Sequence, residues 1–228
     1  MGSEDLHHKK KARKAADLKR QKTDRKRGQR FLIVCEGSKT EPNYLRDLIV
    51  DFGLHPQSVK IAAHDGSSPD CVVAHALSLY DEDARHGDSF DRVFCVFDRD
   101  AHTSFDAAVQ RIHDLTRANP PKPFEAITSA PCFEYWLLLH FGYTNAPFHA
   151  AGKKSVCDAV VTALRSKPNF SNYGKGQAGI YALVKDQTST AINAAAQARE
   201  SAIAAGHVDP HTQFDLLIQA LQALIPAR

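Results

Sequence analysis

The stretch Asp91–Asp100, DRVFCVFDRD, constrains the fold more than any other part of this chain. Residues 93–97 are apolar throughout and rich in β-branched and aromatic side chains, which is typical of a central strand buried on both faces of an α/β sheet. The run stops at Asp98 and Asp100, which alternation along a strand places on the same side. In parallel sheets, ligands bind outside the carboxyl ends of strands. The pair indicates a site for a hard cation such as Mg²⁺ or Mn²⁺, although a solvated acidic turn gives the same pattern.

A second strand end earlier in the chain favours the cation site. Phe31–Cys35 reads as a buried strand, and Glu36 follows it directly. A helix is expected from Thr40, as its cap, to about Val50. Glu36 therefore takes the same kind of position as Asp98, at the carboxyl end of a strand.

The remaining pattern up to residue 128 alternates strands with helices. Strands are expected at 31–35, 59–62, 93–97 and 124–128, and helices at 69–83 and 105–118. This βαβαβαβ order predicts an α/β fold, with a mainly parallel, Rossmann-like sheet flanked by helices. We expect this domain to span residues 31–145.

The segment from 146 to 228 reads as a helical C-terminal region packed on that domain. Before it, a helix apolar almost all round begins at Glu134, whose place in the first turn suits the helix dipole and leaves a metal role open. Helices are then expected at 150–167, 179–206, with a break near 187–189, and 210–224. Lys175, between two glycines, can reach a phosphate, although most such loops are only surface turns.

Charge is distributed unevenly along the chain. Residues 1–30 hold seven Lys, five Arg, one Glu and three Asp, which gives +8, so the overall charge of +3 leaves −5 for residues 31–228. This basic arm, flexible or helical, can attract phosphates or can simply be a solubilising tail. The five cysteines form no CxxC pair, and no membrane span or signal sequence is evident, so a cytoplasmic protein is expected.

Several familiar catalytic motifs are absent. The chain has no GxxxxGK[ST] loop, no GxGxxG and no GxSxG elbow, which argues against nucleotide use through those loops and against an α/β-hydrolase. Phosphatases of the haloacid-dehalogenase type carry their DxD after the first strand, whereas here the first strand ends in Glu36.

Glu after the first strand and DxD after a later one is the arrangement of the Toprim superfamily. The sequence resembles that superfamily and, more closely, the RloB-like family of bacterial phage-defence proteins. The stretches that carry the resemblance are FLIVCEGSKTEPNYL (Phe31–Leu45), VFDRD (Val96–Asp100) and PCFEYWLLLHF (Pro131–Phe141), with weaker matches in YGKGQAGIYALV (Tyr173–Val184) and DPHTQFDLLIQAL (Asp209–Leu221).

The resemblance implies a metal-dependent nuclease. It implies that Glu36 acts as general acid/base or metal ligand and that Asp98 and Asp100 hold Mg²⁺ or Mn²⁺. The third acidic position of the classical motif is His102 here, so the number of metals stays open and Glu134 is a candidate for the missing carboxylate. Lys39, Arg99 and Lys175 are candidate contacts for nucleic acid or phosphate. A partner ATPase of the RloA kind is implied by the resemblance alone.

Two functions remain open at this point. The first is a Toprim-like endonuclease that cleaves DNA or RNA as the effector of an abortive-infection system. The second is a non-catalytic sensor that binds a metal with nucleic acid or nucleotide and signals to an ATPase. The sequence leaves a homo-oligomer open.

Overall fold

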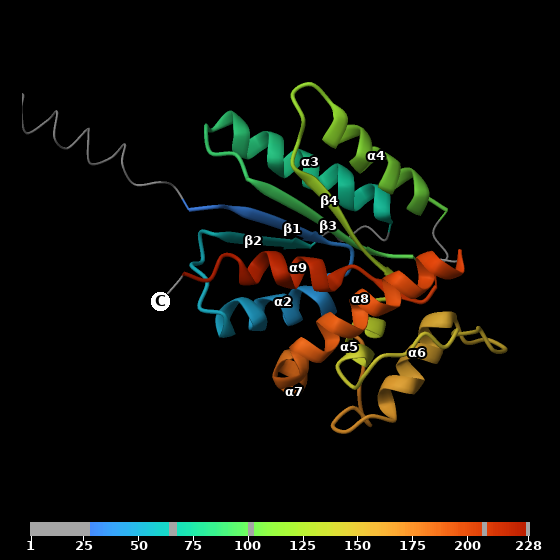
Figure 1. Cartoon of the computed structure of the whole chain (residues 1–228). Coiled ribbons are helices and arrows are strands. Elements are labelled where there is room, and N and C mark those ends of the chain that lie inside the picture. Colours follow the sequence, from blue (N-terminus) through green and yellow to red (C-terminus); the bar gives the residue numbers. More distant parts are fainter. Residues whose placement is uncertain (1–27, 64–67, 100–102, 207–208, 227–228) are drawn as a thin grey trace, which may run out of the picture.

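Apolar, β-branched segments form the sheet at the centre of the protein (Figure 1). The computed structural model describes residues 28–63, 68–99, 103–206 and 209–226. Within these ranges the strands lie in the order β2-β1-β3-β4-β5. Their bounds are β1 (Phe31–Cys35), β2 (Val59–Ala63), β3 (Arg92–Asp98), β4 (Phe124–Ala130) and β5 (His211–Thr212).

The order of the strands determines where a ligand can bind. β1 pairs in parallel with β2 on one side and with β3 on the other, β3 pairs in parallel with β4, and the short β5 runs antiparallel to β4. The chain moves outward from β1 to form β2 and then crosses back to form β3. The boundary between β1 and β3 is therefore a topological switch point, where a crevice opens outside the carboxyl ends of the strands. The mainly parallel, Rossmann-like fold that the sequence predicts is confirmed.

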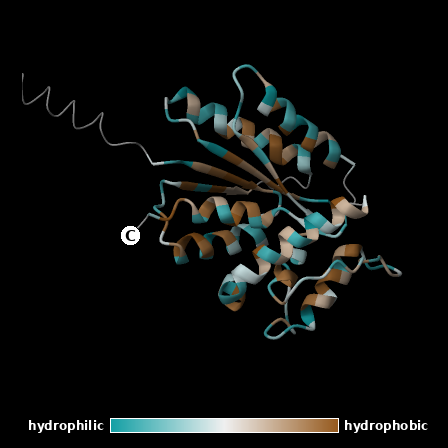
Figure 2. Ribbon diagram, viewed as in Figure 1, coloured by the Kyte–Doolittle hydropathy of each residue, from teal (hydrophilic) through white to brown (hydrophobic). Residues whose placement is uncertain are grey.

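Helices cover both faces of this sheet (Figure 1). Helices α3 (Pro69–Arg85) and α4 (Phe105–Arg117) lie on one face, and α2 (Thr40–Asp51), α5 (Glu134–Leu139) and α9 (Phe214–Gln222) lie on the other. Side chains alternate along β1, so that Val34 packs in the α3–α4 core and Ile33 in the core on the opposite face. Figure 2 shows hydrophobic residues concentrated in the strands between these layers.

The C-terminal helices belong to the same core as the sheet. They comprise α6 (Val156–Arg165), α7 (Ile180–Val184), a 3₁₀ turn η1 (Lys185–Gln187), α8 (Thr188–Ala205) and α9. The turn η1 confirms the break expected near residue 187. The ring of Phe214 in α9 lies 5.0 Å from the ring of Phe133 at the start of α5. Within the described part of the chain, no helix is long and apolar enough to cross a membrane.

Three local expectations are wrong. The helix expected at 150–167 begins only at Val156, because Ala151 and Lys154 pair in an isolated β-bridge before it. The last helix begins at Phe214 and not at residue 210, because His211 and Thr212 pair with the end of β4 as strand β5. Thr40 does not cap α2. It is the first helical residue, and its Oγ1 accepts a hydrogen bond of 2.8 Å from the backbone N–H of Gly176. A contact with a distant loop thus replaces the local cap.

Candidate functional site

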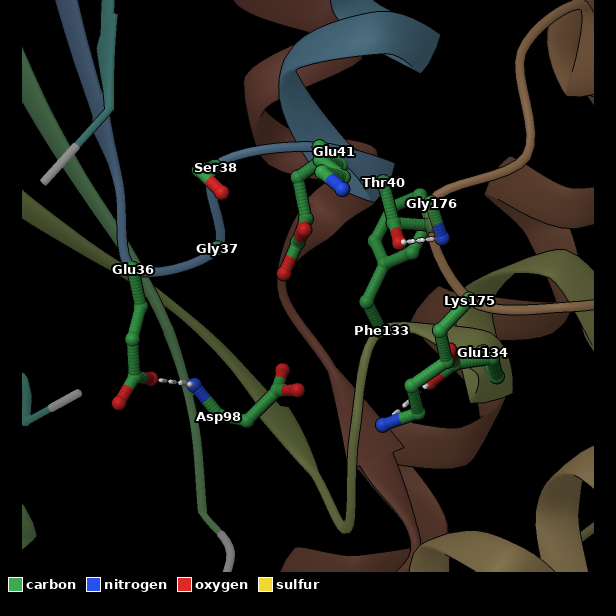
Figure 3. A pocket seen from close by; sticks show the side chains of 11 residues that line it. Glu36, Gly37, Ser38, Thr40, Glu41, Asp98, Phe133, Glu134, Lys175 and Gly176 are labelled. Carbon is green, nitrogen blue, oxygen red and sulfur yellow. Dashed lines mark hydrogen bonds and ion pairs between the residues drawn. The ribbon is translucent and has the colours of Figure 1, made fainter. Parts of the chain in front are cut away.

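A cavity of about 280 Å³ opens at the carboxyl ends of β1 and β3, at the switch point of the sheet (Figure 3). The turn after β1, the end of β3, the start of α5 and a loop before α7 form its walls. Four carboxylates and two lysines line it, so its formal net charge is −2 when all are ionised. The lining residues are Glu36, Gly37, Ser38, Lys39, Thr40, Glu41, Asp98, Phe133, Glu134, Lys175 and Gly176.

Glu36 and Asp98 meet at this cavity because β1 and β3 are neighbouring parallel strands. The backbone N–H of Glu36 donates to the carbonyl of Val96 at 2.9 Å. The Glu36 carboxylate in turn accepts the backbone N–H of Asp98 through Oε2, at 3.2 Å. The two strand ends that the sequence analysis selected therefore lie side by side.

The carboxylates of Glu36 and Asp98 nevertheless point in opposite directions (Figure 3). Cys35 pairs with Val96 in the register of β1 and β3, so Asp98 lies one residue further along its strand than Glu36 does. Successive side chains of a strand point to opposite faces, so these two carboxylates are on different faces. Glu36 continues the alternation of Val34, which packs in the α3–α4 core. Asp98 continues that of Val96, which packs in the core beneath α2 and α5. Asp98 therefore faces side chains from α2 and α5.

Those two helices present Glu41 and Glu134 to Asp98 (Figure 3). Each lies in the first turn of its helix, and they are only 9% and 2% exposed. The positive end of a helix dipole favours a carboxylate in this place, which offsets part of the cost of burying it. Three carboxylates thus gather on one side of the sheet edge.

Gly37 leaves the space that Glu41 occupies. A Cβ atom at position 37 would come 2.6 Å from Oε2 of Glu41, closer than van der Waals contact allows. A larger residue after β1 would therefore force the Glu41 carboxylate to move from its place in the pocket.

The C-terminal region holds Glu134 in place. The hydroxyl of Tyr173 donates to Oε1 of Glu134 at 3.0 Å, and Nζ of Lys175 lies 3.7 Å from Oε2. Tyr173 is buried, whereas the Lys175 side chain is 57% exposed. Both oxygens of this buried carboxylate therefore face groups from one loop.

Burial and mutual repulsion make the pocket hold protons tightly. Burial raises the pKa of Glu41 to about 7, and the Glu134 charge adds to the rise, although the backbone N–H of Glu41 lowers the value. Burial also raises the pKa of Asp98 well above its ordinary range, with further contributions from Glu41 and Glu134. Burial lowers the pKa of Lys175, but the neighbouring negative charges, Glu134 above all, outweigh it and raise the pKa overall.

The remaining residues singled out in the sequence are placed differently. Lys39 lines the pocket, and its side chain lies close to Gly176. Arg99 does not line the pocket, since its guanidinium carbon lies over the ring of Phe105, 5.5 Å from the centroid. Asp100 falls in residues 100–102, which lie outside the described part of the chain.

Two residues escaped the sequence analysis, Glu41, which lines the pocket, and Tyr173, which contacts the lining residue Glu134. Glu41 shows the same signal that selected Glu134, namely an acid in the first turn of a helix that follows a strand end. Tyr173 had no such signal, because it is 39 residues from its partner Glu134 and the contact depends on the tertiary fold.

The donor atoms of the pocket suit a hard divalent cation. Carboxylate oxygens are the ligands that Mg²⁺ and Mn²⁺ prefer. Burial and mutual repulsion together raise the pKa of Asp98 and of Glu41, and a nearby cation would favour the ionised carboxylates again. Among the residues that the structure describes, no group of three or more His, Cys, Asp or Glu side chains is already arranged to hold a metal ion. Binding would therefore require side chains to close around the ion, and Asp98, Glu41 and Glu134 share the side on which this can happen.

Fold and site together define an α/β protein with an acidic pocket at the switch point of a parallel sheet. The family model described as RloB-like protein matches residues 31–221, a range that contains every residue lining the pocket. The chain belongs to the RloB-like family. Comparisons with curated proteins and with solved structures give no match.

Proposed function

We propose that this protein is a Mg²⁺- or Mn²⁺-dependent endonuclease that cleaves phosphodiester bonds in DNA or RNA. The observation that carries the proposal is the convergence of Asp98, Glu41 and Glu134 beside two lysines at the switch point of the sheet. Carboxylates suited to a divalent cation, with ammonium groups suited to a phosphate, are what phosphodiester hydrolysis needs. The resemblance to Toprim enzymes implies the same chemistry.

Each pocket residue has a role in this proposal. Asp98, Glu41 and Glu134 would hold the cation, which when bound would stabilise charge on the attacked phosphate and activate water. Glu36 lies beside Asp98 without sharing its side of the sheet, which suits a general acid or base better than a ligand of the same ion. Lys39 and Lys175 contact phosphate oxygens.

The cellular role follows from the family resemblance. We propose that the enzyme acts in the cytoplasm as the effector of an anti-phage abortive-infection system, together with an ATPase of the RloA kind. The basic arm, residues 1–27 of which lie outside the described ranges, would supply affinity for phosphates.

A second candidate is a sensor that binds a metal with a nucleotide or nucleic acid and does not cleave it. One observation favours this alternative. Oε2 of Glu36 is already engaged by the backbone N–H of Asp98, which restrains a group that the nuclease would use for proton transfer. The sensor would signal to its ATPase partner through binding alone.

Incubation of the protein with end-labelled DNA and RNA pools separates the two candidates. The nuclease should produce fragments with Mg²⁺ or Mn²⁺ and none with EDTA, in assays of the protein alone and with an ATPase of the RloA kind. Asp98→Asn should abolish cleavage, because it removes a cation ligand at constant volume. Asp47→Asn is a matched control, since Asp47 is an exposed carboxylate of α2 that does not line the pocket.

Binding without cleavage under every one of these conditions would favour the sensor. Cleavage that persists unchanged in Asp98→Asn would place the active site elsewhere. Fragmentation that resists EDTA would exclude the metal-dependent mechanism.

A further inference from the structure

The loop that carries Lys175 is fixed to the pocket at two points. The backbone N–H of Gly176 donates to Oγ1 of Thr40 at 2.8 Å, which attaches the loop to the start of α2. The buried hydroxyl of Tyr173 donates to Oε1 of Glu134 at 3.0 Å, which attaches the same loop to the start of α5. Lys175 lies between these two anchors, so the fold directs its side chain to the pocket (Figure 3).

The Lys175 ammonium itself is held loosely. Its Nζ lies 3.7 Å from Oε2 of Glu134, whereas charge-assisted N–H···O hydrogen bonds are about 2.7–2.9 Å long. The Lys175 side chain is 57% exposed and that of Glu134 is 3% exposed. The lysine can therefore leave the carboxylate without breaking a short hydrogen bond, while the carboxylate stays buried in the pocket.

One ammonium is a weak counterion for this site. Glu41, Asp98 and Glu134 line the same pocket, so their charges repel one another when all three are ionised. A divalent cation would neutralise these carboxylates better than a single positive charge does. The two cations would also repel each other strongly at separations of a few ångströms.

We infer that the Lys175 ammonium acts as a built-in competitor of the divalent cation for Glu134, and that loading of the cation turns Lys175 towards the substrate phosphate. This inference rests on the proposed metal-dependent function. It assigns Lys175 two successive partners, first Glu134 and then a phosphate. The exposure of the Lys175 side chain permits this movement, because the loop anchors at Tyr173 and Gly176 need not change.

Manganese binding to the full-length protein, measured by isothermal titration calorimetry, tests the competition without relying on activity. Lys175→Met removes the charge and keeps most of the stem. Because removal of one nearby positive charge favours a divalent ion even in a high dielectric, Mn²⁺ should bind to this variant on the order of tenfold more tightly than to wild type. Lys175→Arg, which keeps the charge, should retain an affinity within about twofold of the wild-type value.

Lys185→Met is the matched control. Lys185 forms a 3.0 Å ion pair with Asp51 and does not line the pocket, so its replacement removes an equivalent charge elsewhere. Its Mn²⁺ affinity should equal that of wild type.

The outcomes separate the inference from the function on which it rests. If Lys175→Met binds Mn²⁺ with unchanged or weaker affinity while wild type binds and cleaves, the competition is wrong and the metal-dependent function stands. If Lys185→Met gains as much Mn²⁺ affinity as Lys175→Met, the gain comes from the lower net charge of the whole protein, and the inference is wrong. If neither wild type nor Lys175→Met binds Mn²⁺, both the inference and the proposed function are wrong.

Discussion

Replacing Glu41 with Gln should stabilise the metal-free protein at alkaline pH. Burial and the neighbouring carboxylates raise the pKa of Glu41 from an ordinary value of 4.5 to about 7 in the folded state. The folded protein therefore binds this proton more tightly than the unfolded chain does. Wild type consequently loses stability as the pH rises from about 4.5 to about 7. The Gln variant has no ionisable group at position 41, so its stability lacks this dependence on pH.

The pKa shift sets the size of the effect. A rise from 4.5 to about 7 corresponds to about 3 kcal/mol of destabilisation once the group is ionised in both states, with each pKa unit contributing about 1.4 kcal/mol. Gln forgoes the attraction between a first-turn carboxylate and the helix dipole, which is about 0.3–1 kcal/mol. Glu41→Gln should therefore raise the free energy of unfolding by about 2 kcal/mol at pH 8 and by less than about 1 kcal/mol at pH 5.

Urea unfolding in EDTA at pH 5 and pH 8 provides the measurement, with Asp47→Asn as control. Asp47 is an exposed carboxylate of the same helix, so its replacement should change stability by less than about 0.5 kcal/mol at either pH. An equal effect of Glu41→Gln at both pH values, or a loss of stability at pH 8, would refute the account of Glu41 as a strained, buried acid.

Three further predictions concern the metal and the arm. Replacement of both Asp98 and Asp100 with Asn should leave the EDTA-treated protein melting at least as high as wild type. In thermal melts it should also remove the stabilisation that we expect Mg²⁺ or Mn²⁺ to give wild type. Gly37→Ala should displace the Glu41 carboxylate, so that Mn²⁺ titration shows weaker binding while urea unfolding shows a loss of at most about 1 kcal/mol. Deletion of residues 1–27, which spares the ion pairs of Arg30, should weaken nucleic-acid binding and flatten its dependence on salt; unchanged binding would make the arm a solubilising tail.

Periodicity was sufficient to predict the parallel part of the sheet. Continuous apolar runs such as 31–35 and 93–97 are long enough to be recognised as buried strands without any tertiary information. The two-residue β5 could not be found this way, because it exists only by pairing with the end of β4, more than 80 residues earlier. Local signals at Pro210 favoured a helix start in the same place.

The pocket was predictable in location but only partly in composition. The topology of an α/β sheet is enough to predict that Glu36 and Asp98 lie at the ends of neighbouring strands. The opposite directions of their side chains depend on the register between β1 and β3, which no local sequence pattern encodes. Glu41 was recoverable, because it carries the same first-turn signal as Glu134. Tyr173 was not, since its importance comes entirely from a contact made in the folded chain.

The place where the basic arm joins the sheet sets the length of nucleic acid that could contact both the arm and the pocket. Arg30, its last residue, is fixed at the amino end of the sheet by ion pairs with Asp83 and Asp88, at 2.8 and 2.7 Å, and by a hydrogen bond from its backbone N–H to Asp91. The five residues of β1, at about 3.3 Å each, separate that end from the pocket by roughly 17 Å. In the proposed nuclease, an arm rooted there would act as a tether that raises the local concentration of a polymer near the pocket. Its benefit should therefore grow with substrate length and disappear for oligonucleotides too short to reach both ends of the sheet.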